Sequence, residues 1–370
     1  MKHIRWFALV LALCLALGLV GCGPAPLRET VRGSGVVVTR ELGLPEGEAA
    51  LRVGGISVQN FGEFLLIVDE GLGRKAVLET DNNISARLRL EYRAGTITFS
   101  APRNTVFTPT RLTLTVGAPV RDLDVDGLWE VRYSCPSVRD GRLVLDGAAK
   151  GDFAFGEMDR LNMRFEGLGK VNVTGKDVRE CRLKTDGSVN GDFTLGAVDR
   201  LDMDLSGLGM VNLNSTGVRD CRLISDGAVS GDFALGEMDR LDMNLSGLGK
   251  FKIDSTGVRD CKLRADGSVN GDFTLGEMDS LDMTLEGLGR VAVRGTAQRA
   301  VLRLDGGSSV SAFDLVAQDA EVIISGLGSC EITAEQNLKA SVEGSGTITY
   351  GGNPKEVYQD VQGLGRVKPR

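Results

Sequence analysis

The sequence predicts an all-β protein, a parallel β-solenoid (β-helix) of coils of about 20 residues preceded by a β-rich cap. Glycine supplies 50 of the 370 residues, about twice its usual share. A 40-residue repeat in the centre of the chain divides into two weaker repeats of half that length. Apolar and polar residues alternate within these repeats, and no helical period is sustained after residue 30. Repeats of this length built from short strands are typical of stacked solenoid coils.

Residues 1–21 have the features of a secretory signal peptide. Lys2 and Arg5 precede a short apolar run that ends at Val20, and this run is too short for a typical membrane span. Leu19-Val20-Gly21-Cys22 is similar to the lipobox of bacterial lipoproteins, in which cleavage precedes the cysteine and the thiol is lipidated. An ordinary signal or anchor, in which Cys22 is incidental, is the alternative.

The expected location is therefore the bacterial cell envelope, where lipid on Cys22 would anchor the exported chain to a membrane. Gly23 follows the cysteine, and an aspartate there would be similar to an inner-membrane retention signal. We therefore favour the outer membrane or cell surface over the inner membrane. Residues 22–32 form a short linker, which would keep the folded body close to the membrane.

Residues 33–120 are expected to form an N-terminal β-rich cap. They lack the 20-residue period, and a solenoid needs an end that blocks its open sheet edges. Five segments are typical of ordinary strands: residues 36–38, 64–68, 88–90, 96–99 and 112–116.

Residues 121–370 are expected to form the solenoid rod. A turn glycine marks each coil, because corners between short strands need unusual backbone dihedrals. Thirteen such marks predict a rod of roughly 60 Å at about 4.8 Å per coil. Residues 350–354 and the basic tail after them are expected to close the far end. The marks are Gly127, Gly147, Gly167, Gly187, Gly207, Gly227, Gly247, Gly267, Gly287, Gly306, Gly326, Gly344 and Gly363.

Aligning the chain in rows of one coil each produces apolar columns, which predict core ladders. Large and small side chains alternate in one column, so that successive layers fill space without voids. The first column is Leu143, Met163, Leu183, Met203, Leu223, Met243, Leu263 and Met283. The second is Leu161, Cys181, Leu201, Cys221, Leu241, Cys261, Leu281 and Val301. The third is Phe153, Val173, Phe193, Leu213, Phe233, Ile253, Phe273 and Val293.

Outward columns alternate in charge, which explains why the clear period is two coils. A one-coil period would stack like charges about 4.8 Å apart. We interpret the columns as a structural checkerboard that opposes slippage by one coil; a charged docking stripe is the alternative. One column is Arg139, Asp159, Arg179, Asp199, Arg219, Asp239, Arg259, Asp279 and Arg299. Its neighbour is Asp140, Arg160, Glu180, Arg200, Asp220, Arg240 and Asp260.

Composition excludes several functional classes. The net charge is −7, and it falls to −9 when the signal peptide removes Lys2 and Arg5, so nucleic acid is not an expected partner. His3 is the only histidine and leaves with the signal peptide, which excludes His-dependent catalysis and zinc sites that need His. We predict no cofactor, no metal and no catalytic residue.

Cysteine and aspartate are the remaining candidate ligand types. Cys181, Cys221 and Cys261 lie two coils apart, about 9.6 Å, whereas the Cα atoms of a disulfide lie about 4.4–6.8 Å apart. We therefore predict buried free thiols. The Asp-rich turns are interpreted as solvated Asp-Gly turns, and calcium ligation is the alternative. These aspartates are Asp146, Asp186, Asp226, Asp266 and Asp305, and Asp152, Asp192, Asp232 and Asp272.

Several motifs resemble one bacterial family. They are Gly33-Ser-Gly35, Asp81-Asn-Asn83, Gly95-Thr-Ile-Thr98, Tyr350-Gly-Gly-Asn-Pro354 and Val361-Gln-Gly-Leu-Gly365. Residues 33–370 resemble the "putative auto-transporter adhesin, head GIN domain" family, a domain of unknown function. Here the turns are mostly Gly-Leu-Gly instead of the usual Gly-Ser-Gly, and the central repeats look expanded. The resemblance implies an exported, β-helix-like bacterial protein and supplies no active site.

Two functional hypotheses follow. The first is a non-catalytic surface or envelope lipoprotein, a rigid β-helix that acts as an adhesin-like interaction module or spacer. Its partners would be the membrane, through the lipid anchor, and a glycan or envelope protein. The alternative is a carbohydrate-binding or polysaccharide-cleaving β-helix. A catalytic site normally breaks a repeat with unique side chains, and the repeat is irregular near Trp129-Glu130, at Tyr133–Pro136 and after Arg299. Trp129 and Tyr133 are therefore either a sugar-stacking platform or a cover over the junction of cap and rod.

Overall fold

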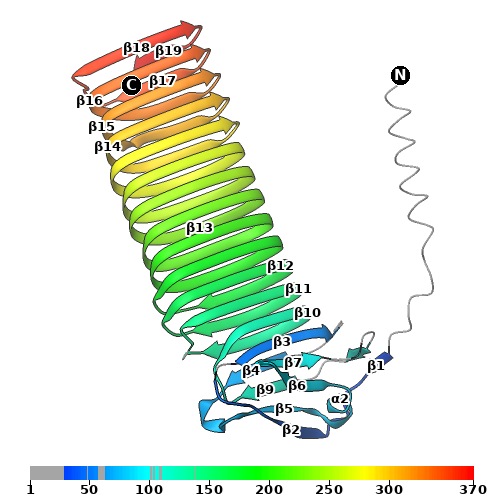
Figure 1. The fold of residues 1–370 in the computed structure, drawn as a ribbon. Helices are drawn as coiled ribbons and strands as arrows, with labels where there is room; N and C mark the ends of the chain where they lie inside the picture. The colour runs from blue at the N-terminus through cyan, green and yellow to red at the C-terminus, as the bar shows by residue number, and fades with distance from the viewer. Residues whose placement is uncertain are drawn as a thin grey trace, which may run out of the picture.

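The computed structural model describes residues 29–47, 49–56, 63–100, 102, 105–107, 111–136 and 138–370. Cys22 and the predicted signal peptide lie outside these residues. A small β-rich region at the N-terminal end supports a long rod of parallel coils (Figure 1). The rod has about 12 turns with a spacing of roughly 20 residues, against the thirteen predicted. The all-β solenoid prediction is confirmed.

The N-terminal region mixes parallel and antiparallel pairing among the strands of its described residues. β2, β5 and β9 pair antiparallel, as do β6 and β7, whereas β3 and β4 run parallel to β7, β9 and the first coil of the rod. The strands are β1 (Glu29–Val31), β2 (Val37–Gly43), β3 (Ala49–Ile56), β4 (Glu63–Val68), β5 (Lys75–Asp81), β6 (Arg89–Arg93), β7 (Thr96–Ser100), β8 (Thr105–Phe107) and β9 (Arg111–Val116). The short helices η1 (Glu70–Leu72) and α2 (Asn82–Ser85) lie between them.

Two of the motifs that resemble the family are in contact in this region. The backbone N–H of Gly35 donates a hydrogen bond to Asp81 Oδ1 at 2.7 Å. Ser34 donates through its backbone N–H to Asn83 Oδ1 at 3.1 Å and through its hydroxyl to Asn82 Oδ1 at 2.6 Å. Hydrogen bonds between the Gly33-Ser-Gly35 and Asp81-Asn-Asn83 motifs therefore hold the segment that precedes β2 against the end of β5.

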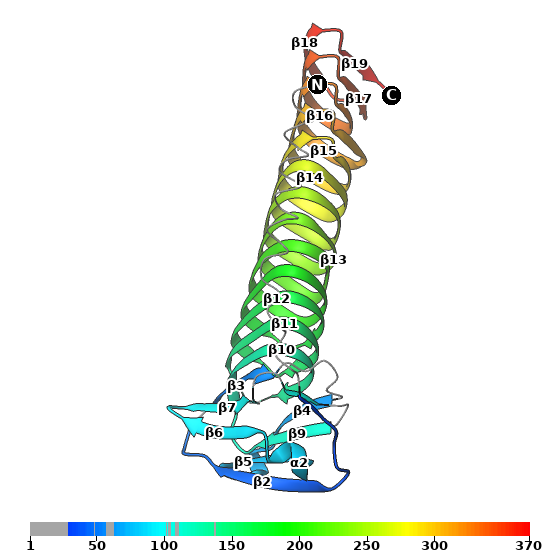
Figure 2. The same ribbon diagram turned by 90° about the vertical axis from the view of Figure 1, so that its right-hand side faces the viewer.

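Each coil of the rod pairs in parallel with the next, so that a residue lies opposite the residue one coil further along the chain. Leu143 lies opposite Met163, which lies opposite Leu183. The turned view shows the coils stacked along one axis (Figure 2). The strands are β10 (Val120–Cys135), β11 (Asp140–Phe155), β12 (Met158–Thr174), β13 (Val178–Gly287), β14 (Arg290–Gly306), β15 (Ser309–Gly326), β16 (Ser329–Gly344), β17 (Thr347–Gly351), β18 (Glu356–Gly363) and β19 (Arg366–Pro369).

The predicted apolar columns form one continuous core along the rod. Phe153, Phe193, Phe233 and Phe273 are buried, and the smaller Val173, Leu213, Ile253 and Val293 lie in the alternate coils of the same column. Burying each of these side chains contributes about 1.5–3 kcal/mol before the entropic cost of ordering the chain.

The register between coils shortens by one residue after Thr274. Glu277 lies opposite Thr296 and Leu281 lies opposite Ala300, one position less than a full coil in each case. The placement of Val301 in the second core column is therefore wrong, and Ala300 takes that position. Arg299 is likewise misplaced in the charge column, because it lies opposite Ser280. The physical reason is an irregularity in the strand pairing. The three-residue step from Thr274 to Glu277 lies opposite the two-residue step from Arg294 to Thr296, so the later coil is one residue shorter.

The turn glycines allow the coils to stack closely at one corner. Gly207 and Gly227 have φ angles of 93° and 105°, in the left-handed region that favours glycine. A Cβ on Gly227 would lie 2.5 Å from the backbone oxygen of Gly207. The corner therefore needs glycine for both its dihedral angles and its close approach to the coil before it.

Gly227→Ala is expected to lower the free energy of unfolding by about 2 kcal/mol or more, because it adds both backbone strain and a steric clash. Guanidinium denaturation monitored by circular dichroism would measure the change. Gly217→Ala is the matched control, since its nearest atom outside the local chain would be Glu237 O at 3.9 Å. Equal effects of the two substitutions would contradict this account of the corner.

Candidate interaction surfaces

One face of the rod carries the predicted charge checkerboard. Asp159 forms ion pairs with the coil before it through Arg139 and with the coil after it through Arg179, each at 3.4 Å. Arg219 pairs with Asp199 at 3.4 Å, and Arg259 pairs with Asp239 at 3.1 Å. Exposed pairs of this kind contribute only about 0–1 kcal/mol each. Their alternating signs nearly cancel locally, which makes this face a weak electrostatic attractor and supports the structural interpretation.

A second face, which we call the polar face, presents small and mostly polar side chains in two neighbouring outward columns. Asn172 Nδ2 donates to Asp152 Oδ1 at 2.6 Å, and Asn212 Nδ2 donates to Asp192 Oδ1 at 2.8 Å. The same amide–carboxylate pair is thus repeated two coils further along the rod. The polar face consists of Asp152, Asn172, Asp192, Asn212 and Asp232, and of Ala154, Thr174, Thr194, Asn214 and Ala234.

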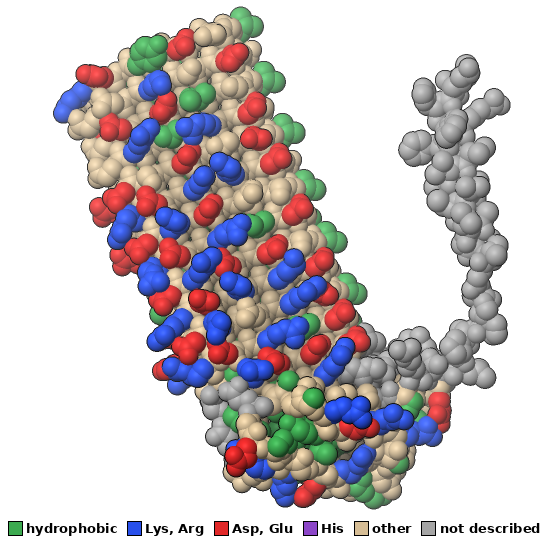
Figure 3. Space-filling model, in the orientation of Figure 1, with side chains coloured by type: hydrophobic (Ala, Val, Ile, Leu, Met, Phe, Trp, Pro, Cys, Tyr) green, Lys and Arg blue, Asp and Glu red, His purple; other side chains and the backbone are tan. Residues whose placement is uncertain are grey.

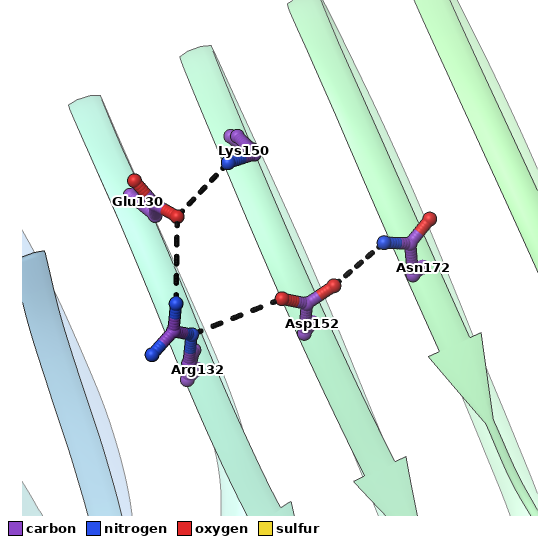
Figure 4. Close-up of polar contacts among 5 residues, drawn as sticks. All are labelled: Glu130, Arg132, Lys150, Asp152 and Asn172. Carbon is purple, nitrogen blue, oxygen red and sulfur yellow. Dashed lines mark hydrogen bonds and ion pairs between the residues drawn. The ribbon is translucent and has the colours of Figure 1, made fainter.

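The polar face begins with a connected set of charges next to the cap. Lys150 pairs with Glu130 at 3.0 Å, and Arg132 lies 3.9 Å from both Glu130 and Asp152 (Figure 4). These side chains come from β10 and β11, and Asn172 of β12 continues the row. Several aspartates considered above as calcium ligands are therefore already engaged with cations or amides. Within the described ranges, no group of three His, Cys, Asp or Glu side chains could hold a metal ion.

Two shallow grooves of similar size lie along the polar face. The first, about 610 Å³, lies where cap and rod meet, and Ile67, Pro136 and Asp152 are among its lining residues. The second, about 600 Å³, lies further along the rod, where Asp192, Met210, Asn212 and Lys252 contribute to its lining. The two grooves are successive stretches of one face and not unrelated cavities.

Tyr133 does not form a sugar-stacking platform, so that interpretation is wrong for this residue. Its side chain is buried and its hydroxyl donates to the backbone oxygen of Val120 at 2.5 Å. Burial raises the pKa of Tyr133, and the neighbouring Cys135 raises it further. The ring packs edge-on against Phe155, with 5.7 Å between centroids. Tyr133 thus covers the junction of cap and rod, which was the other interpretation; the Trp129 side chain lies outside the described residues.

The prediction of buried free thiols is confirmed for Cys181, Cys221 and Cys261. Cys135 and Cys330 are also buried and form no disulfide with another described residue. Burial raises the pKa of Cys181, Cys221 and Cys261 to about 12. The carboxylate of Asp202 adds to the shift at Cys181 and Cys221, and that of Asp242 adds to it at Cys261. These thiols remain protonated at neutral pH and act as small apolar core residues.

Stability is expected to fall as the pH rises from about 9 to 12. In this window the unfolded chain releases its thiol protons while the folded chain retains them, so the unfolded state binds fewer protons. Each fully ionised thiol contributes a slope of about 1.4 kcal/mol per pH unit. Cys181→Ala/Cys221→Ala/Cys261→Ala should make the decline shallower, as measured by urea denaturation at several pH values. An unchanged slope would show that other groups cause the decline.

Sequence reasoning missed an exposed column of leucines, which we call the leucine edge. These residues lie between the two glycines of the Gly-Leu-Gly corners, and each is more than half exposed. Green side chains mark this edge along the right-hand border of the rod in Figure 3. The recurrence of Gly-Leu-Gly is visible in the sequence, and the alternation that buries Phe165 and Val171 places Leu168 outward. The leucine edge consists of Leu168, Leu208, Leu248, Leu288, Leu327 and Leu364.

In the part of the chain that the structure describes, no helix has the length and apolar character needed to cross a membrane.

The fold and surfaces define a β-solenoid whose exposed chemistry repeats from coil to coil. The family model described as "Putative auto-transporter adhesin, head GIN domain" matches residues 56–254 and 259–354. The chain therefore belongs to this family, which confirms the resemblance. No protein with a curated description matches the chain significantly.

The solved structures that match the chain include proteins from Bacteroides and Parabacteroides species. A putative adhesin from Bacteroides fragilis NCTC 9343 has 15% identity and a TM-score of 0.24, and the match covers 92% of this chain and 100% of that one. A putative adhesin from Parabacteroides merdae ATCC 43184 has 16% identity and a TM-score of 0.24, with 92% and 99% covered. A putative lipid binding protein from Parabacteroides distasonis ATCC 8503 has 16% identity and a TM-score of 0.22, with 92% and 100% covered.

Proposed function

We propose that this protein is a non-catalytic envelope lipoprotein whose rigid rod serves as an adhesin-like interaction module. Membership of a family described as adhesins supports a surface role. The observation that carries the proposal is the polar face, because one set of small polar side chains recurs along successive coils. A ligand that binds weakly at each coil gains affinity by contacting several coils at once.

A glycan is the ligand class that the polar face favours. Carboxylate, amide and hydroxyl groups are the hydrogen-bonding partners that sugar hydroxyls use, and the two grooves run in series along the rod. An extended polysaccharide could lie along both. Apolar residues such as Ile67 and Pro136 in the first groove could contact the apolar side of a sugar ring.

The test uses the chain from Gly23 onward, which contains every described residue, on an array of bacterial and host glycans with and without calcium. We expect saturable binding to one glycan class. Asp152→Ala/Asn172→Ala should weaken it by about tenfold, roughly the loss of one to two hydrogen bonds to charged or polar groups. Asp192→Ala/Asn212→Ala is the matched pair two coils along, and comparing the two variants would show which groove binds.

If the folded protein bound no glycan on the array, the glycan part of the proposal would be wrong. An envelope protein as partner, or a spacer role, would then be favoured. Cleavage is the competing activity. New reducing ends or unsaturated ends in a bound polysaccharide would contradict the non-catalytic assignment.

The lipid anchor is the second part of the proposal, and it depends on the lipobox at Cys22. Several acyl chains on one cysteine would hold the protein stably on a membrane, whereas one chain gives only marginal binding. Cys22→Ser is expected to move the protein from the membrane fraction to the soluble fraction of a producing bacterium. Mass spectrometry of the wild-type N-terminus should show lipid on Cys22. Unmodified Cys22 in membrane-bound protein would indicate an ordinary uncleaved anchor.

A further inference from the structure

The leucine edge is not required by the corner that carries it. Leu168 lies opposite Ser188 in the next coil and Ala148 in the coil before it. Those two coils form the same corner with alanine or serine in place of leucine. The glycine before each of these residues, Gly147 or Gly187, has a positive φ angle, as Gly167 does before Leu168. The leucines are between 59% and 84% exposed. Since turn geometry tolerates serine and alanine here, a line of exposed leucines needs another explanation.

A regular line of apolar side chains is typical of an interaction surface. The leucines recur every second coil, about 9.6 Å apart, over a length of about 48 Å. Single exposed leucines are ordinary on a soluble protein, but contiguous apolar patches mark sites of association.

Charged columns flank the leucine edge, and their signs differ between its two sides. From residue 146 onward, the position two residues before the corner leucine or its counterpart is acidic in eight coils and serine or glutamine in the others. The position two residues after it is basic in five coils and uncharged in the others. The acidic side consists of Asp146, Glu166, Asp186, Asp226, Asp266, Glu286, Asp305 and Glu343. The basic side consists of Lys150, Lys170, Lys250, Arg290 and Arg366.

This pattern is complementary to a second copy of the same chain in one orientation. A two-fold axis parallel to the rods places the acidic side of one rod beside the basic side of its partner, on both flanks of the contact. A two-fold axis perpendicular to the rods places acid beside acid and base beside base. Like charges in such positions repel, whereas opposite charges orient the association.

We propose that two copies of this chain associate side by side and parallel, edge to edge, through the leucine edge. Each leucine of the edge, from Leu168 to Leu364, contacts the same leucine of the other rod, because equal residues lie at equal positions along the two rod axes. Ion pairs between the copies, such as Lys170 with Glu166, flank the contact in the coils where both columns are charged, as at Leu168 and Leu288. The proposal does not depend on glycan binding, and a shared membrane anchor at the cap end would be consistent with it.

The size of the contact predicts a weak dimer. Glu166 and Lys170 are separated by about 13 Å along an extended chain, so the strip covers at most about 600 Å² on each rod. Stable interfaces usually bury about 800 Å² on each partner. We therefore expect a concentration-dependent dimer in solution, which tethering of both copies to one membrane would strengthen.

Sedimentation velocity over a range of concentrations tests the association with the chain from Gly23 onward. Wild-type protein is expected to shift from monomer to dimer as concentration rises. Leu208→Ser/Leu248→Ser/Leu288→Ser should raise the dissociation constant by about 100-fold or more, with little effect on stability, because these side chains are exposed. Thr174→Ser/Thr194→Ser/Asn214→Ser, on the polar face, is the matched control. A wild-type monomer at all concentrations, or equal effects of the two triple variants, would overturn the proposal.

Single cysteines on the leucine edge test the orientation. Leu208→Cys and Leu327→Cys should each form disulfide-linked dimers alone under mild oxidation, because a parallel pair sets equal residues at equal height. The native thiols of the described residues are buried and remain unreactive. Thr256→Cys is the exposed control away from this edge and should not cross-link. Cross-links that form only when Leu208→Cys and Leu327→Cys proteins are mixed would indicate an antiparallel pair and overturn the parallel arrangement.

Discussion

The register between successive coils is the constraint on which the rest of the structure depends. Parallel pairing along the rod sets each residue beside its equivalent one coil away, and glycine corners let the backbones approach closely enough to maintain that spacing. Once the register is set, every side chain becomes a member of a column. The apolar core, the ion-pair ladders, the polar face and the leucine edge are therefore consequences of one geometric repeat, and a register error would disturb them together.

Much of this arrangement could be predicted because a solenoid converts sequence spacing directly into spatial neighbourhood. The Phe153–Val173–Phe193 column and the Arg139–Asp159 ion pair both follow from counting one coil length along the chain. The step of 19 residues from Gly287 to Gly306 shows in the sequence that one coil is a residue short, but it does not show where along the coil the register changes, and the structure places that change after Thr274. Val301 and Arg299 are misplaced for that reason. The leucine edge is missed because an apolar side chain is expected in the interior, although the alternation continues through the corner and places Leu168 outward between Glu166 and Lys170.

The N-terminal region resisted prediction for a different reason. Its strands pair with partners far apart in sequence, as β2 does with β5 and β3 does with β10. The sequence of this region has no repeat from which such pairings could be predicted. β3 and β5 are absent from the strands that the sequence predicts. The contact between Gly33-Ser-Gly35 and Asp81-Asn-Asn83 shows what those motifs do locally, since carboxylate and amide oxygens accept the N–H and hydroxyl groups of a glycine-rich turn. Antiparallel pairing in this region also limits the growth of a parallel sheet at the cap end of the rod.

The same repeat that stabilises the rod also determines how it can interact. A pocket in a globular enzyme gathers unique side chains at one point, and its affinity depends on a few strong contacts. A solenoid distributes modest contacts along a line, so its affinity depends on how many coils a partner can engage. The polar face and the leucine edge lie in different columns of the same coils, and each additional coil pair lengthens both. The two surfaces adjoin, because Met210 contributes to the second groove and lies in the column that flanks the leucine edge. An extended ligand on the polar face and a second rod on the leucine edge would therefore lie side by side.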